Sequence, residues 1–364
     1  MRLRRWFLLL LALTLIAPTT SLASSAKATL KRVTRITRTL THNDRPSPTG
    51  VMRIGAASDD QPAGTAPRRA AVAILDTGIA RIPELNVVGG HDCSGSGNFS
   101  DANGHGTHVA GIVGARWAPG RINRVVGVSP GTPLYSVRVF DEGGSGDLAN
   151  VVCGLNWVAA NAAALNIRVV NMSLGEAGTD DSRCPDTKNS LHAAVCKVIA
   201  KGVTVVAAAS NESESLAKSV PGTFDEILTV TAMADFDGQP GGKGTADCSD
   251  NNHDDSAADF SDYAVPGSAD AGHTIAAPGV CITSTWMDGT TETMSGTSMA
   301  SPHVAGLIAR CIDAGPCASL SPAQITAKLL ADAAARPADT GFAGDPQHPI
   351  SGKYYGNLAW ARGY

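Results

Sequence analysis

From residue 70 to the C-terminus, short hydrophobic runs alternate with longer segments in which hydrophobic residues recur at helical spacing. The short runs predict strands at residues 71–76, 134–140, 167–175, 203–210 and 227–233. The longer segments predict helices at residues 105–115, 148–165, 189–201, 297–311 and 322–335. Val, Ile and Ala fill the strands without polar alternation, which is typical of a parallel sheet buried on both faces. The pattern therefore predicts an α/β fold, a doubly wound parallel sheet with helices on both faces, in one domain over residues 70–364.

The first 69 residues differ from the rest of the chain in their composition and hydrophobic pattern. Three arginines precede an apolar run from Trp6 to Ala17, and small residues surround Ala23, so residues 1–23 are predicted to be a secretory signal peptide. The apolar run is shorter than the roughly 20 residues of a membrane-spanning helix, so we expect a secreted, extracellular protein without a permanent membrane anchor. Residues 24–69 are basic and rich in turn-forming residues. They are predicted to be an N-terminal extension or short propeptide, removed in part by cleavage near Arg45.

Composition narrows the class of protein further. The 364 residues are 43% hydrophobic and 17% charged, which is ample for a large core. The net charge of −4 gives no basic field of the kind that binds nucleic acid, so no nucleic-acid partner is expected. We expect a monomer.

The eight cysteines, an even number in a chain predicted to be exported, favour four disulfides over a metal site. Pairing over short loops costs the least loop-closure entropy, which favours bridges across the two shortest spacings. Of the remaining four, Cys93 precedes the predicted helix at 105–115 and Cys153 lies in the next helix, while Cys248 and Cys281 flank one excursion of the chain. The predicted bridges are Cys93–Cys153, Cys184–Cys196, Cys248–Cys281 and Cys311–Cys317.

Polar residues stand where such a sheet places its ligands, at the carboxyl ends of the strands. Asp76 ends the first strand in "ILDTGI", and Asn211 follows the strand at 203–210. His105 opens a helix between two glycines in "NGHGTHVAG". Ser298 lies among small residues at the start of another helix in "GTSMASPHVAG", where Pro302 is expected in the first turn. Taken alone, Asp76 is more often a turn or cap residue and Asn211 a turn residue, and Ser298 is about as often an N-cap as a nucleophile.

Together these residues predict nucleophilic catalysis. A serine hydroxyl needs an adjacent base, and the base needs a carboxylate to orient it, roles that Ser298, His105 and Asp76 can fill. The side-chain amide of Asn211 could donate to a developing oxyanion. His108, one turn beyond His105, is expected to be a buried core histidine, because the two histidines lack the spacing and the glutamate of a zinc-binding helix.

The motifs "DTGI", "HGTHVAG", "NMSLG" and "GTSMASPHVAG" resemble those of the subtilisin-like serine proteases, the subtilase family, from about residue 70 to the C-terminus. The order Asp, His, Ser along the chain distinguishes this family from other serine hydrolases. The resemblance implies a secreted serine endopeptidase that hydrolyses protein or peptide substrates through an acyl-enzyme intermediate on Ser298. It implies no cofactor for the chemistry.

The resemblance also implies substrate-binding residues. Their expected roles are to pair with an extended peptide, to face it from the opposite side, or to line the pocket next to the cleaved bond. The residues expected to pair with the peptide are Ser173, Leu174 and Gly175. Those expected to face it from the opposite side are Gly144, Ser145 and Gly146. Those expected to line the pocket are Ala208, Ala209 and Glu212. Ser210 and Ser219 depart from the family pattern, because both replace common glycines and add volume and polarity. Glu84 is the candidate ligand for a structural calcium ion, although the loop after the His105 helix is longer here and contains arginines.

Two other functions compete with a hydrolase. A catalytically inactive secreted protein could keep the groove for binding alone, and labelling by a serine-directed fluorophosphonate would distinguish it. A ligase-type subtilase would have to exclude water from the acyl-enzyme, for which the sequence shows no insertion.

Overall fold

The computed structural model describes residues 48–57, 70–116, 125–179, 182–246, 248, 251–361 and 363–364. The predicted signal peptide and most of the 24–69 extension, including Arg45, lie outside the described residues.

Seven parallel strands form the central sheet in the order β10-β8-β6-β4-β1-β3-β2, and β9 pairs antiparallel with β8. The strands of this sheet are β1 (Ala71–Asp76), β2 (Val87–Asp92), β3 (Leu134–Arg138), β4 (Ile167–Met172), β6 (Thr204–Ala208), β8 (Leu228–Ala234), β9 (Ser256–Ala257) and β10 (Thr274–Pro278). The order reverses at β1, with β4, β6, β8 and β10 following outward on one side and β3 and β2 on the other, in keeping with the predicted doubly wound fold. Two small antiparallel sheets pair β5 (Glu176–Ala177) with β7 (Ser219–Val220) and β11 (Ile282–Thr285) with β12 (Thr291–Met294).

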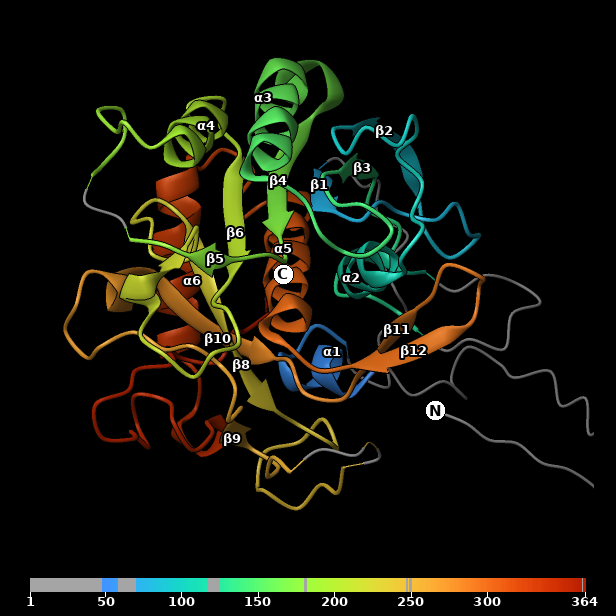
Figure 1. Ribbon diagram of the computed structural model, residues 1–364. Helices are drawn as coiled ribbons and strands as arrows, with labels where there is room; N and C mark the ends of the chain where they lie inside the picture. Colours follow the sequence, from blue (N-terminus) through green and yellow to red (C-terminus); the bar gives the residue numbers. More distant parts are fainter. Residues whose placement is uncertain are drawn as a thin grey trace, which may run out of the picture. The chain divides into compact units, whose positions relative to one another are not determined.

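Helices cover both faces of the sheet, as predicted (Figure 1). On one face lie α3 (Leu148–Leu165) and α4 (Ser190–Ile199), and on the other lie α2 (His105–Gly114), α5 (Thr297–Ala314) and α6 (Pro322–Ala334). Each layer has its own hydrophobic core against the sheet. By length and composition α3 could cross a membrane, but it is the crossover between β3 and β4 and buries Val151, Leu155 and Val158 in one of these cores.

All four predicted disulfides are confirmed. Bridges join Cys93 to Cys153, Cys184 to Cys196, Cys248 to Cys281 and Cys311 to Cys317. They span 60, 12, 33 and 6 residues of sequence.

Residues 48–57, which the sequence places in the N-terminal extension, pack into the core of the domain. Helix α1 (Thr49–Arg53) buries Val51, and Ile54 follows it with no exposed surface. A five-residue helix is too short to show hydrophobic periodicity, which is why the sequence pattern does not reveal it.

Arg53 fastens this segment to two distant parts of the chain. Its guanidinium, in a side chain 1% exposed, donates to Asp255 Oδ1 from Nε at 2.9 Å and from Nη2 at 2.6 Å. It also donates to the carbonyls of Thr340 and Gly341. Burial raises the pKa of nearby Asp235 to about 8, against the attraction of Arg53 at 3.3 Å.

We expect Arg53→Met to lower the free energy of unfolding by about 3–5 kcal/mol, because it leaves the Asp255 carboxylate buried without its cation. Urea unfolding in a Ser298→Ala background, which avoids self-digestion, measures the change. Arg81→Met is the control, since this exposed arginine lies over the Phe99 ring and should contribute less than about 1 kcal/mol. A loss below that control value for Arg53→Met would contradict the prediction.

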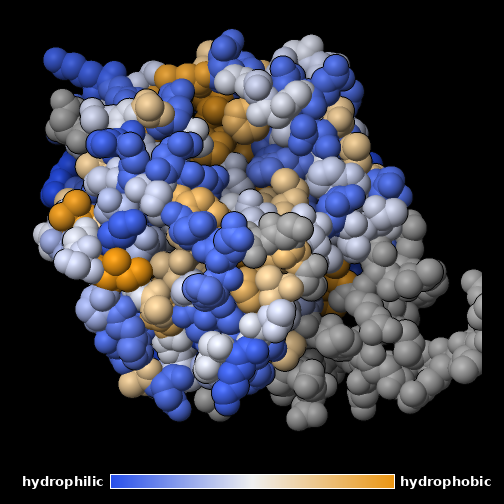
Figure 2. Space-filling view, turned by 60° about the horizontal axis from the view of Figure 1, so that its bottom comes forward, coloured by the Kyte–Doolittle hydropathy of each residue, from blue (hydrophilic) through white to orange (hydrophobic). Residues whose placement is uncertain are grey.

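Hydrophilic residues predominate on the face shown in Figure 2, and hydrophobic residues gather there in small groups. Among the described residues, the large hydrophobic side chains that are exposed are Val88, Leu148, Val265, Met287 and Ile350. They come from separate elements, and exposed hydrophobic residues scattered in this way are normal for a monomeric protein. The expected monomer stays a prediction.

Candidate active site

Asp76 and His105 are in direct contact at the carboxyl end of the sheet. Asp76 is the last residue of β1, fully buried, and its Oδ1 lies 2.7 Å from His105 Nδ1. His105 is the first residue of α2, and its side chain is 23% exposed. Gly106 permits this approach, because a Cβ there would lie 2.1 Å from the Gly78 carbonyl oxygen. With Nδ1 held by Asp76, the other ring nitrogen of His105 is the one available to a substrate.

Asp101, which no motif in the sequence singled out, holds the start of α2 in place. Its Oδ1 accepts hydrogen bonds from Thr77 Oγ1 and from the Asn103 and Gly104 amides. Its Oδ2 accepts from the amide and the hydroxyl of Thr107. An aspartate shortly before a helix is a capping signal, so the sequence did contain a clue to this role.

The carboxylates around His105 change its basicity. Burial alone would lower the pKa of His105, but the charge and the hydrogen bond of Asp76, helped by the charge of Asp101, raise it above its ordinary value. The ring is therefore a stronger base than a free histidine.

Ser298 is the second residue of α5 and contacts the end of β4. Its hydroxyl donates to the Ser173 carbonyl at 3.2 Å, and the Ser173 hydroxyl donates to the Ser298 carbonyl at 2.8 Å. The second bond is available because Pro302 has no N–H to reach the carbonyl four residues earlier. Pro302 thus lies in the second turn of α5 and not in the first, a correction of the expected position.

Thr297 orients Asn211, another link that the sequence did not reveal. The Asn211 Oδ1 accepts from the Thr297 amide at 2.9 Å and from the Thr297 hydroxyl at 3.0 Å. With Oδ1 engaged, the side-chain NH2 of Asn211 is the group that remains as a donor in the cavity it lines beside Ser298.

Two adjoining cavities of about 520 Å³ each contain most of the predicted site residues. We call the first the His105 cavity; of the predicted residues, it is lined by His105, Gly144, Ser145, Gly146, Ser173, Leu174 and Gly175. We call the second the Ser298 cavity; it is lined by Leu174, Gly175, Ala208, Asn211, Glu212 and Ser298. Leu174, Gly175 and Glu176 line both, so the cavities form one continuous depression.

Ser210 and Ser219 lie against each other in the wall of the Ser298 cavity. Their hydroxyl oxygens are 2.6 Å apart. Ser210 has a φ of 87°, a left-handed conformation that favours glycine. The two residues that depart from the family pattern therefore form one polar contact in the pocket next to Ser298.

Three other residues lie away from the cavities. Ala209 is fully buried and lines neither of them. His108 is the core histidine that was predicted: it is fully buried, contacts the Ile282 and Glu292 carbonyls, and burial lowers its pKa to about 4. Glu84 is 1% exposed, and no cluster of metal-ligating side chains among the described residues includes it.

Comparison with known proteins decides the family. A model of the subtilase family matches residues 68–352. The chain is a subtilase. Subtilisin DY from Bacillus licheniformis is 36% identical over 267 residues, which are 72% of this subtilase and 82% of that protein. The minor extracellular protease Epr from Bacillus subtilis (strain 168) is 33% identical over 248 residues, 68% of this subtilase and 32% of that protein.

The solved structure of Sphericase superimposes on this subtilase with a TM-score of 0.68 at 27% identity, covering 87% of this chain and 98% of that chain. As a subtilase, the protein is a serine protease, a hydrolase that acts on peptide bonds, and subtilases need no cofactor for this chemistry.

Proposed function

We propose that this subtilase is a secreted endopeptidase that cleaves peptide bonds through an acyl-enzyme on Ser298. His105 removes the proton of the Ser298 hydroxyl as it attacks the carbonyl carbon, and later delivers that proton to the leaving amine. Water then attacks the acyl-enzyme with His105 again as base, which releases the acid product and restores Ser298. Asp76 keeps the His105 ring oriented and stabilises its positive charge.

The observation that carries this proposal is the Asp76–His105 contact of 2.7 Å beside the cavities that hold Ser298 and its neighbours. Without substrate, the Ser298 hydroxyl donates to the Ser173 carbonyl. The hydrogen bond between a catalytic hydroxyl and its base often becomes short and well aligned only when substrate is bound. The cavity edges at Ser173–Gly175 and Gly144–Gly146 are suited to an extended peptide, whose backbone can pair with them. Ala208 and Glu212 would contact the side chain next to the cleaved bond.

Labelling tests the proposal directly. A serine-directed fluorophosphonate should attach to one residue, Ser298, and abolish hydrolysis of a casein or peptide substrate with the same time course. Peptide mapping by mass spectrometry locates the label. A protein that binds peptides but neither reacts nor hydrolyses them would establish the inactive binding function instead, and efficient peptide-bond formation in water would favour the ligase.

Asn211→Ala should lower kcat by about 10²- to 10³-fold and leave KM nearly unchanged, because the amide donates only once the carbonyl oxygen becomes negative. This magnitude is known for loss of a single such donor in subtilisin, a member of the same family. Asn211→Asp should be at least as harmful, since it places negative charge beside the oxyanion. Steady-state kinetics and melting temperature measured together test this: a wild-type kcat in Asn211→Ala, with or without a lowered melting temperature, would contradict the assignment.

The remaining parts of the proposal concern the mature protein. Secretion is supported by the signal-like N-terminus and by the extracellular protease to which the chain is similar. Processing upstream of Pro48, near Arg45, would keep the buried segment 48–57 in the mature enzyme. A monomer without a membrane anchor completes the proposal. A structural calcium ion at Glu84 is not part of it, because Glu84 belongs to no cluster of metal-ligating side chains among the described residues.

A further inference from the structure

Two hydrophobic side chains in the wall of the His105 cavity come from segments remote from the proposed catalytic residues. Leu191 is the second residue of α4 and 2% exposed, and Val220 ends β7 and is 5% exposed. Their positions determine how well a large side chain of a bound peptide fits this cavity, because burial against them is what favours its binding.

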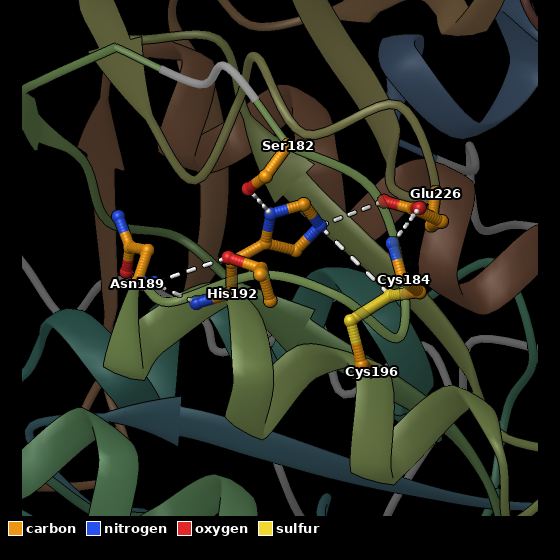
Figure 3. Close-up of a disulfide and its surroundings, with 7 residues drawn as sticks. Ser182, Cys184, Asn189, His192, Cys196 and Glu226 are labelled. Carbon is orange, nitrogen blue, oxygen red and sulfur yellow. Dashed lines mark hydrogen bonds and ion pairs between the residues drawn. A yellow bond between two sulfur atoms is a disulfide. The ribbon is translucent and has the colours of Figure 1, made fainter.

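Behind this wall, the side chains of Glu226 and His192 and the Cys184–Cys196 bridge join the two segments (Figure 3). Glu226 Oε2 accepts from His192 Nε2 at 2.8 Å, and Glu226 Oε1 accepts from the Cys184 amide at 2.8 Å. In Figure 3 the His192 ring lies between Ser182 and Glu226, with the bridge alongside. We call Cys184, Cys196, His192 and Glu226 the bridge cluster.

The His192 side chain of the bridge cluster is buried and closely packed. His192 has no exposed surface, and its ring stacks on Phe224 with centroids 4.2 Å apart and planes within 7°. Burial alone would raise the pKa of Glu226, but the Cys184 amide and His192 outweigh it and lower the pKa, so the carboxylate is charged at neutral pH. Hydrogen bonds to a charged, partly buried acceptor are stronger than those between neutral groups.

Members of the bridge cluster are also close in sequence to both wall residues, Leu191 and Val220. His192 directly follows Leu191, and Asn189 caps the same helix end by accepting from the Leu191 and His192 amides. Val220 leads into the turn that carries Phe224 and Glu226. A displacement of Glu226 would therefore move Leu191 and Val220 relative to each other.

We propose that Glu226 is a positioning residue for substrate selection: through His192 and the Cys184–Cys196 bridge, it holds Leu191 and Val220 at the spacing that accepts a large apolar side chain in the His105 cavity. It takes no part in bond cleavage. The inference rests on the proposed function, because it concerns peptides bound in the same depression.

Selectivity at one peptide position is the test. Peptides carry Leu or Ala in turn at each position N-terminal to the cleaved bond, and kcat and KM are measured per active site titrated with fluorophosphonate. Leu191→Ala identifies the position that enters the His105 cavity, because the Leu/Ala ratio of kcat/KM falls there. We expect Glu226→Ala to lower the ratio at that same position by about tenfold, roughly half the burial energy of one large side chain, through KM and not through kcat.

Two variants serve as controls. Glu226→Gln can still accept from the Cys184 amide and contact His192, so it should restore most of the selectivity. Asp225→Ala removes the neighbouring carboxylate, which pairs with the 76% exposed Arg183 at 2.8 Å. An exposed ion pair contributes little, so Asp225→Ala should match the wild type.

Each result decides for or against the inference. An unchanged Leu/Ala ratio in folded Glu226→Ala, or an equal loss in Asp225→Ala, would overturn it, as would a loss carried by kcat. Should Glu226→Ala not fold, the double variant Cys184→Ala/Cys196→Ala decides by the same ratio. Failure of the wild type to react with fluorophosphonate would instead refute the proposed function.

Discussion

Replacing Ser298 by Ala is expected to lower kcat by about 10⁶-fold, the size known for loss of the nucleophile in subtilisin. Without the hydroxyl no acyl-enzyme forms, and His105 has no proton to remove, so nucleophile and base are lost together. The activity that remains comes from water attacking a bound, polarised carbonyl. The substitution removes only one hydrogen bond, from Ser298 to the Ser173 carbonyl, so the fold should be nearly as stable as the wild type.

The measurement combines kcat with fluorophosphonate labelling and melting temperature. Ser96→Ala is the control, since this exposed serine donates to the Asn98 carbonyl and lines neither cavity, so its loss should leave all three unchanged. Hydrolysis by folded Ser298→Ala at more than about one-hundredth of the wild-type rate would mean that another residue is the nucleophile.

The elements that carry these residues were predictable because their hydrophobic patterns are long and regular. The predicted strand 71–76 and helix 148–165 match β1 and α3 residue for residue. The central strands are continuous apolar runs that fit the buried middle of a parallel sheet. Helix ends shifted by one to three residues, as at α5, where the pattern stops at 311 and the helix continues to Ala314.

The outer strands escaped prediction for a physical reason. β2 has the sequence VVGGHD and lies at one edge of the sheet, only partly buried, so it contains no apolar run. β10 has the sequence TIAAP and lies at the other edge, where a proline is tolerated because no further strand needs its N–H.

Within the site, sequence motifs located the proposed catalytic residues but not Asp101 and Thr297, which hold the start of α2 and Asn211 in place. Asp76, His105 and Ser298 stand at strand and helix ends that the pattern locates. Thr297 holds Asn211 across 86 residues of sequence, and no local pattern predicts a contact between two such residues. Arg53 and Asp255, 202 residues apart, show the same limit in the core.

Asp76→Asn should lower kcat by about 10⁴-fold, because an amide at this position can favour the wrong tautomer of His105 and cannot stabilise its positive charge. The pH dependence separates this role from a structural one. Activity requires neutral His105, and Asp76 raises the pKa of His105, so the wild-type kcat/KM should rise with pH through a midpoint above the ordinary histidine value of about 6.5. In Asp76→Asn the attraction is gone while burial still lowers the pKa of His105, so the midpoint should move to lower pH.

The contribution of His105 to the stability of the fold should fall as pH rises, whereas activity should increase. A histidine whose pKa is raised on folding stabilises the native state fully below its unfolded pKa, and this contribution is lost as pH rises through the folded pKa. Melting temperatures of wild type and Asp76→Asn should therefore differ more at pH 5 than at pH 9, where His105 is neutral in both. Asp339→Asn, at an exposed position, is the matched control and should alter neither profile. If the midpoint of Asp76→Asn stayed at the wild-type pH, the Asp76–His105 contact would be a feature of packing alone and His105 would need another partner to act as the base.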